Sequence, residues 1–292
     1  LPKTRRSHKN RLVHIAIVEM MSLKEQLADP YYLYLKNYVV RNCMEHDCNV
    51  SYLFEQSGKY QTLEKTPLDG ILAIGIFSDQ QIAQLLDISP NIVFVDSSPD
   101  ERRFDSVVLN FRLGVEQALD HLLYKGHRKI GFLGPVYKLD QKKRPALEAR
   151  RQYFIDYMKN AGLFDEHLII DTGLSARDGS AQIRKWLEQK DHIPTALLAY
   201  NEESAITAVS NLREIGLRVP EDVSVISFND TPLSILTEPP LTSVTAHLEV
   251  MGEMAVKMLL DRLDDPQHLP YKIVLPPTLA VRDSVVDIPG EI

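Results

Sequence analysis

Short apolar runs alternate with amphipathic segments along almost the whole chain. Runs such as "GILAIGI" (70–76) and "TALLAY" (195–200) have the length of a strand, while "EESAITAVSNLREIG" (202–216) carries its apolar residues at helical spacing. Strands that are apolar on both faces are typical of a parallel sheet that helices cover on either side. The sequence therefore predicts an α/β fold.

The alternation of strands and helices occurs as two series. The first begins with the strand "RLVHIAIV" (11–18) and the helix "DPYYLYLKNYVVRNCMEHD" (29–47), and it ends with "SVVLN" (106–110). The second begins with the strand "KIGFLGP" (129–135), which follows the helix "RLGVEQALDHLLYKG" (112–126). Two doubly wound parallel-sheet halves fit 292 residues better than one very wide sheet. We place the boundary between them near Asn110.

The C-terminal segments have to be shared between these halves. After "EPPLTSVTAH" (238–247) come a further helix, "EVMGEMAVKMLLDRL" (249–263), and a strand, "YKIVLPPTLAV" (271–281). A chain that crosses more than once between two halves forms a hinge with a cleft, as in proteins that close on a ligand. We expect residues 12–109 plus 241–273 in an N-terminal subdomain and residues 110–240 plus 274–292 in a C-terminal one.

Charge and hydropathy exclude several classes of protein. No apolar run approaches the roughly 18–20 residues of a membrane helix, so we expect no membrane contact and a cytoplasmic protein, although a trimmed export signal stays open. The net charge of −7 argues against a large nucleic-acid-binding surface. One basic stretch is the exception: residues 1–11 are either a solvated tail or a linker stub leading to a part that binds phosphate, and they contain Lys3, Arg5, Arg6, Lys9 and Arg11.

Signals for catalysis, metals and cofactors are weak. The sequence has no phosphate-binding glycine loop, no Gly-x-Ser-x-Gly elbow and no pair of histidines at the spacing of a zinc helix. Cys43 and Cys48 lack companions at zinc spacing, which favours structural or incidental thiols. A carboxylate pair among Asp96, Glu202 and Asp230 could serve glycoside hydrolysis, but one sequence gives no separation between them. We therefore expect neither an enzyme nor a bound metal or cofactor.

Polar side chains follow several of the expected strands. Each one alone is ordinary turn or helix-cap chemistry. Because parallel strands end at the same edge of a sheet, where open α/β folds bind ligands, these side chains could also form a common site. Asn and Asp offer the paired donors and acceptors that sugar hydroxyls require. The residues are Asp96, Asn110, Asn201, Asn229 and Asp230.

Several longer motifs resemble the effector-binding core of LacI/GalR-type transcriptional repressors, from about Leu12 to Asp283. The most specific are "HLLYKGHRKIGFLGP", "IPTALLAYNEESAITAVSNLREIGLRVPEDVSVISFND", "EPPLTSV" and "LPPTLAVRDS". Within that family, "DPYYLYLKNYV" and "SFNDTP" are similar to the galactose and evolved β-galactosidase repressors. The resemblance implies a periplasmic-binding-protein-like fold, with a sugar bound in the cleft between two hinged subdomains.

The resemblance also implies partners. In the family a helix-turn-helix domain and a hinge helix precede this core, so we expect operator DNA to be bound through an N-terminal domain that is missing here, by a homodimer. The small-molecule effector would be galactose or a galactoside. The helix from about Pro30 to Glu45 is a candidate dimer surface, although core packing explains its tyrosines equally well. A transport-associated sugar-binding protein of the same fold is the alternative.

Family positions carried over to this sequence give the candidate ligand contacts. The loop that opens the first helix contributes an acid and two tyrosines, whose rings would stack on a pyranose, and Arg150 matches the family's Arg-x-x-Gly-Phe arginine. Its neighbour Arg151 is expected to face solvent. Asn229 stands where an acid is usual, and His247 is a possible substitute for a polar residue usually found at Ala246. The full set is Asp29, Tyr31, Tyr32, Asp96, Phe111, Arg150, Asn201, Asn229 and His247.

Overall fold

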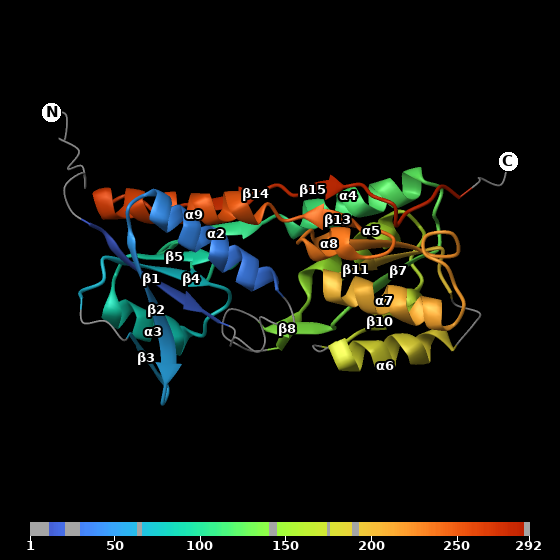
Figure 1. Ribbon diagram of the computed structural model, residues 1–292, viewed down its shortest axis with the longest axis horizontal. Helices are drawn as coiled ribbons and strands as arrows, with labels where there is room; N and C mark the ends of the chain where they lie inside the picture. Colours follow the sequence, from blue (N-terminus) through green and yellow to red (C-terminus); the bar gives the residue numbers. More distant parts are fainter. Residues whose placement is uncertain are drawn as a thin grey trace. The chain divides into compact units, whose positions relative to one another are not determined.

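The computed structural model describes residues 12–20, 30–62, 66–139, 145–173, 176–188 and 193–288. They form two compact units, each built on its own sheet (Figure 1). Unit 1 consists of Leu1–Leu109, Leu139–Arg144 and His247–Leu275; unit 2 consists of Asn110–Lys138, Pro145–Ala246 and Pro276–Ile292. The prediction of two α/β halves is confirmed.

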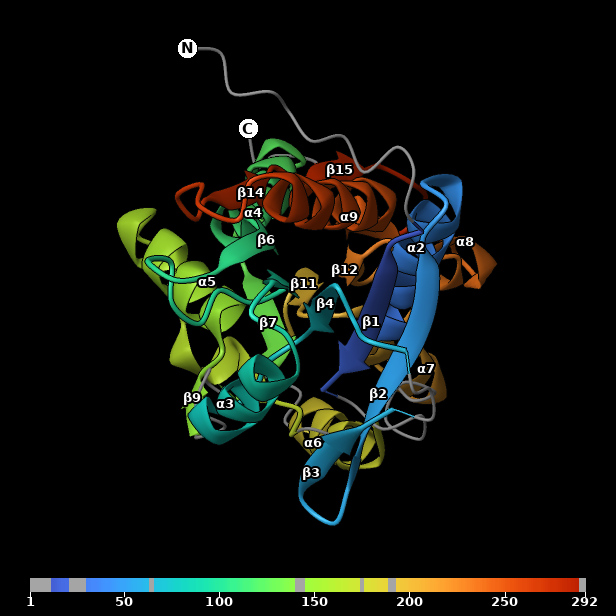
Figure 2. The same ribbon diagram turned by 90° about the vertical axis from the view of Figure 1, so that its left-hand side faces the viewer.

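The sheet of unit 1 is parallel apart from one edge. Its strands lie in the order β14-β6-β5-β4-β1-β2-β3, and among the described pairs only β2 and β3 are antiparallel. Figure 2 shows β1 and β2 running side by side. The bounds are β1 (His14–Glu19), β2 (Asn49–Gln56), β3 (Lys59–Gln61), β4 (Gly70–Ile74), β5 (Ile92–Val95), β6 (Asp105–Leu109) and β14 (Lys272–Leu275).

Helices cover both faces of this sheet. Helices α2 (Tyr31–Glu45) and α9 (Leu248–Asp264) lie side by side on one face, and α3 (Asp79–Ile88) packs on the other (Figure 1). Gly252 allows the close approach of α9 to α2, because a Cβ atom at this position would lie 3.0 Å from the backbone of Tyr38. Alternate strand residues therefore serve two separate layers of core, and this explains why β4 and β5 are apolar throughout.

Unit 2 repeats this plan with a different set of elements. Its strands lie in the order β10-β7-β11-β12-β13-β15, and among those described only β13 and β15 pair antiparallel. Two pairs of helices pack on its faces, α4 with α5 and α6 with α7. The bounds are β7 (Ile130–Gly134), β10 (Ile169–Asp171), β11 (Ala196–Ala199), β12 (Ser224–Asn229), β13 (Thr242–Thr245), β15 (Thr278–Ala280), α4 (Phe111–Tyr124), α5 (Ala149–Asn160), α6 (Ala176–Leu187), α7 (Glu202–Glu214) and α8 (Leu233–Leu236).

The structure differs from the expected elements in three places. Residues 241–246 lie in unit 2 instead of the N-terminal subdomain, because β13 pairs with β12. The single strand expected over 271–281 is two strands in different sheets, with Pro276 and Pro277 between them. The segment "ALEARRQYFIDYMKNAG" (146–162) predicts a helix from Ala146, but α5 starts at Ala149, since 145–147 form β9 (Pro145–Leu147), which pairs with β8 (Tyr137–Leu139).

Two smaller features complete the fold. A 3-10 turn (Glu166–Leu168) leads into β10. Within the described residues, no helix is long and apolar enough to cross a membrane.

Candidate functional site

In unit 1, two tyrosines and a carboxylate meet at the end of the sheet. Tyr31 and Tyr32 begin α2, and Asp96 directly follows β5. The hydroxyl of Tyr32 donates to Asp96 Oδ2 at 2.7 Å and that of Tyr31 to Oδ1 at 3.2 Å. The two rings lie edge to face, with their centroids 5.0 Å apart. Three of the predicted contacts are therefore brought together within one unit.

Backbone geometry sets the position of Asp96. Its φ of +64° lies in the left-handed region, which Asp tolerates better than most residues because of its short polar side chain. Both tyrosine rings are buried, and the hydroxyl of Tyr31 also lies 4.0 Å from the sulfur of Met251 on α9. Tyr31 thus also packs in the core against α9, which is the alternative explanation that the sequence allowed for the tyrosines of this helix.

Two other residues were predicted for this region, His247 and Asp29. His247 precedes α9, with a φ of +49° and no capping hydrogen bond from its side chain. Asp29 lies outside the described residues.

In unit 2, β12 ends on two consecutive residues with left-handed backbone. Asn229 has a φ of +96° and Asp230 a φ of +55°. Left-handed conformations cost non-glycine residues free energy, least for Asn and Asp, so this pair has the residue types that the turn requires. The turn interpretation of "ND" therefore explains the backbone of both residues, and their side chains have to be considered one by one.

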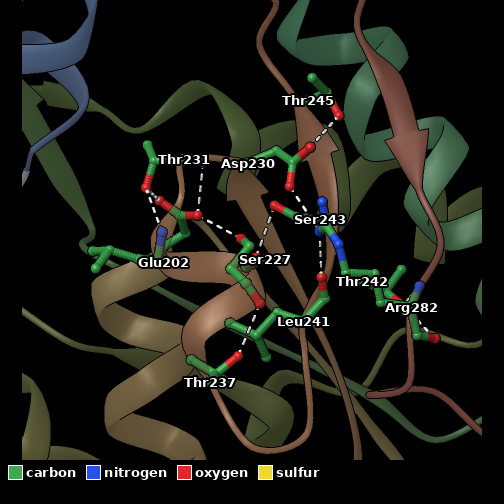
Figure 3. A network of polar contacts seen from close by, with 12 residues as sticks. Glu202, Ser227, Asp230, Thr231, Thr237, Leu241, Thr242, Ser243, Thr245 and Arg282 are labelled. Carbon is green, nitrogen blue, oxygen red and sulfur yellow. Dashed lines mark hydrogen bonds and ion pairs between the residues drawn. The ribbon is translucent and has the colours of Figure 1, made fainter.

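Asp230 uses its side chain to brace the turn (Figure 3). One carboxylate oxygen accepts a hydrogen bond from Thr245 Oγ1 at 2.7 Å, and the other lies 2.7 Å from Nη1 of Arg282. The same Nη1 donates to the carbonyl of Leu241 at 2.7 Å. Asp230 thus ties the end of β12 to β13 and to the segment after β15.

Asn229 differs from its neighbour. The residue is 6% exposed, and among the described residues its amide forms no hydrogen bond. Its amide atoms do not belong to the fully buried polar atoms that lack a partner, so they keep some access to solvent and can bond a ligand.

A buried acid holds the segment that follows. Glu202, the first residue of α7, accepts hydrogen bonds from Thr231 N at 2.8 Å, from Thr231 Oγ1 at 2.6 Å and from the hydroxyl of Ser234 (Figure 3). Burial, with a smaller contribution from the charge of Asp230, raises the pKa of Glu202 to about 7, against the hydrogen bonds that favour its charged form. Asp230 and Glu202 therefore fix the segment that directly follows Asn229.

Arg150 lies in an aromatic enclosure in the same unit. Its guanidinium carbon lies 4.6 Å from the ring centroid of Phe111, 5.0 Å from that of Tyr200 and 5.5 Å from that of Phe228. Nη1 donates to the carbonyl of Tyr200 at 2.6 Å, and Nε donates to Glu148 Oε1 at 2.9 Å. The enclosure thus joins two of the predicted contacts, Arg150 and Phe111, with residues that the prediction did not include.

Helix capping explains two further polar residues. The side-chain oxygen of Asn201 accepts from Ser204 N at 3.0 Å at the start of α7, and that of Asn110 accepts from Leu113 N at 3.1 Å at the start of α4. Arg151, expected in solvent, is instead half-buried and donates to the carbonyl of Gly134 at 3.4 Å.

Sequence reasoning missed the acid beside Arg150 and two rings around it. Glu148 stands two residues before Arg150, a spacing that carries no pattern until the start of α5 is known. Tyr200 and Phe228 were indicated only by position, since each directly precedes a predicted contact, Asn201 or Asn229. Among the described side chains, no group of three or more His, Cys, Asp or Glu residues could hold a metal ion.

Comparison with known proteins identifies the family. The periplasmic binding protein-like domain matches residues 119–285. The chain is 30% identical to the HTH-type transcriptional repressor MelR of Bacillus subtilis (strain 168), over 92% of this chain and 78% of that protein. The chain belongs to the LacI/GalR family of transcriptional regulators.

Other members of the LacI/GalR family are similarly related to it. The HTH-type transcriptional regulator GalR of Streptococcus thermophilus is 29% identical over 97% of this chain and 84% of that protein. Among solved structures, a complex of the transcriptional regulator CelR with cellobiose is 26% identical, with a TM-score of 0.76 over 93% of this chain and 84% of that one. The family resemblance predicted from the sequence is confirmed.

Proposed function

We propose that this chain is the effector-binding core of a transcriptional repressor and that its effector is a galactose-type sugar. Sugar binding as such is supported by the relative CelR, which was solved with cellobiose. The preference for a galactoside is supported by "DPYYLYLKNYV" and "SFNDTP", which are similar to repressors of the galactoside branch.

The observation that carries the proposal is the side chain of Asn229. It stands at the carboxyl end of a central parallel strand, where α/β folds bind ligands. Its backbone lies in the left-handed region, and its amide forms no hydrogen bond among the described residues while keeping some access to solvent. A sugar hydroxyl can both donate to the amide oxygen and accept from the amide nitrogen.

The other candidate contacts have chemistry that suits a pyranose. In unit 1, the rings of Tyr31 and Tyr32 offer apolar faces, and Asp96 is an acceptor for sugar hydroxyls. In unit 2, Arg150 contributes a planar set of donors that its aromatic neighbours hold in place. Asn201, Phe111 and His247 complete the proposed set, together with Asp29.

The proposed mechanism is a shift between two arrangements of the units. A sugar that binds one arrangement more tightly favours it, and operator affinity can change only by as much as the sugar's affinity differs between the arrangements. We propose that operator DNA is bound in the cytoplasm by a homodimer, through a helix-turn-helix domain of the kind named in the relatives, and that the basic residues 1–11 lead to it.

Two adjacent apolar side chains are a candidate part of the dimer surface. Ile235 and Leu236 on α8 are 57% and 77% exposed. Large apolar side chains that are exposed next to each other favour contact with another protein surface more than isolated ones do.

The experiment is calorimetric titration of this chain with galactose, lactose, allolactose, cellobiose, glucose and ribose. Asn229→Ala should weaken galactoside binding at least about tenfold, because one or two hydrogen bonds to a buried group are lost. Asn211→Ala is the matched control: this buried amide in the same unit already bonds Thr207 O at 2.8 Å and Ser180 Oγ at 3.2 Å, so its loss should leave sugar affinity unchanged.

The two ways of failing have different meanings. If none of the sugars binds, the assignment of a sugar effector is wrong. If a galactoside binds equally well to the Asn229→Ala variant, Asn229 serves only the turn.

A further inference from the structure

Glu148 and Arg150 form a buried ion pair at the start of α5. Glu148 Oε1 lies 2.9 Å from Nε and 2.8 Å from Nη2 of Arg150, and Oε2 accepts from the backbone N–H of Arg151 at 3.1 Å. The two residues are only 1% and 4% exposed. Glu148 thus has two roles in one side chain: it caps the helix and it neutralises the arginine.

The surroundings of the pair keep its charges weakly screened. Aromatic rings of Phe111, Tyr200 and Phe228 lie over the guanidinium, and they replace water that would otherwise solvate it. Electrostatic interactions are several times stronger in such a place than at the surface. The presence or absence of one negative charge at Glu148 therefore changes how the pair interacts with any charged group that approaches.

Two of the rings around the pair are sequence neighbours of proposed sugar contacts. Tyr200 directly precedes Asn201 and Phe228 directly precedes Asn229, at the carboxyl ends of the adjacent strands β11 and β12. A ligand held by these asparagines would therefore come near the guanidinium and its acid.

We propose that Glu148 is a specificity-determining residue, which makes this half of the site accept an uncharged sugar and reject anionic derivatives of the same sugar. The inference rests on the proposed function. An arginine without a carboxylate partner binds phosphate and carboxylate groups through paired, charge-assisted hydrogen bonds. Glu148 already accepts hydrogen bonds from the guanidinium donors that would otherwise bind an anion. Its negative charge also repels an incoming anion.

The test compares neutral and anionic sugars on wild type and on Glu148→Gln. The probes are galactose, galactose 6-phosphate and galacturonic acid, the last two to separate a phosphate from a carboxylate. Wild type should bind galactose and prefer it over both anions. In the variant the preference should fall at least about tenfold, and the gain for anions should shrink as salt is added, since salt screens the exposed charge of the ligand.

Two further variants isolate the charge. Glu221→Gln removes one negative charge from an exposed position of the same unit and should leave the preference unchanged. In the double variant Glu148→Gln/Arg150→Gln, the unpaired guanidinium is gone, so no gain for anions should occur even if overall affinity drops. Circular dichroism checks that each variant folds.

The outcomes separate this inference from the proposed function. If wild type binds galactose but Glu148→Gln keeps the same preference, Glu148 serves only the fold and the helix cap. If wild type binds galactose 6-phosphate as tightly as galactose, the inference is wrong, and this result does not need the variant to fold. If wild type binds none of the sugars titrated above, the proposed function itself is wrong.

Discussion

Replacing Asp105 by alanine should destabilise unit 1 by about 3–5 kcal/mol, because it leaves a buried guanidinium without its counter-charge. The carboxylate of Asp105 is fully buried at the start of β6. It lies 2.8 Å from Nε and 2.7 Å from Nη2 of Arg262, near the end of α9. It also accepts from the backbone N–H of Tyr271 at 2.9 Å and lies 3.2 Å from Nε2 of His268. One side chain therefore holds the end of α9 and the segment leading to β14.

The magnitude follows from comparison with an exposed pair. Arg102 and Asp100 form a similar ion pair at 3.1 Å, but the Arg102 side chain is 89% exposed. Water solvates it when its partner is removed, so Asp100→Ala should cost far less stability than Asp105→Ala. If the cost at Asp105 arises from the unpaired charge, the double variant Asp105→Ala/Arg262→Met should recover much of the stability that Asp105→Ala loses.

The assay is urea unfolding followed by far-ultraviolet circular dichroism and by tryptophan fluorescence. The only tryptophan of the chain, Trp186, lies on α6 in unit 2, so its fluorescence reports on the unit that does not contain Asp105. The circular dichroism transition should move to lower urea in Asp105→Ala. A loss of less than about 1 kcal/mol, or a double variant no more stable than the single one, would show that the charge pair is not what stabilises this region.

Three other predictions test different parts of the chain. The carboxyl of Glu202 has a pKa of about 7 in the folded protein and an ordinary pKa of 4.5 in the unfolded one, so between these values it is protonated only when the protein is folded. Wild type should therefore lose about 2 kcal/mol of stability as the pH rises from about 5.5 to 8. Urea titrations at the two pH values should show this loss in wild type and not in Glu202→Gln. Burial raises the pKa of Cys43 to about 12 and also raises that of Cys48, so neither thiol should react with Ellman's reagent in the native protein, and both should react in guanidinium chloride; fast native labelling would contradict their burial. Leu236→Asp should shift a dimer toward monomer in sedimentation velocity runs, and an unchanged sedimentation coefficient would remove α8 from the interface.

The alternation of strands and helices could be predicted because parallel strands buried on both faces leave continuous apolar runs. The pairs β2–β3 and β8–β9 involve strands of three residues, too short to leave a periodic signal. The segment 271–281 was wrongly expected to be one strand, since Pro276 and Pro277 interrupt its hydrogen bonding without interrupting its hydrophobicity.

For the site, the sequence indicates which residues follow strands but not which side chains they bond. Residues that follow strands are visible in a sequence, so Asp96 and Asn229 could be selected. Which side chain each one bonds depends on contacts distant in sequence: Asp230 binds Arg282, and no spacing rule connects them. Glu148 is close to Arg150 in sequence, yet its role depends on where α5 begins.

The discontinuity of unit 1 has a consequence for how the protein is made. Six strands of its sheet lie within the first 109 residues, but α9, which covers one face, begins only at Leu248. A ribosome adding about 5–20 residues per second needs on the order of ten seconds to pass from the end of β6 to the start of α9. During that time the apolar face of β4 and β5 lacks its cover, while the residues of unit 2 are being synthesised. The half that starts first therefore cannot complete its core until most of the other half has been synthesised, and the nascent chain meanwhile presents an open apolar sheet to which chaperones can bind.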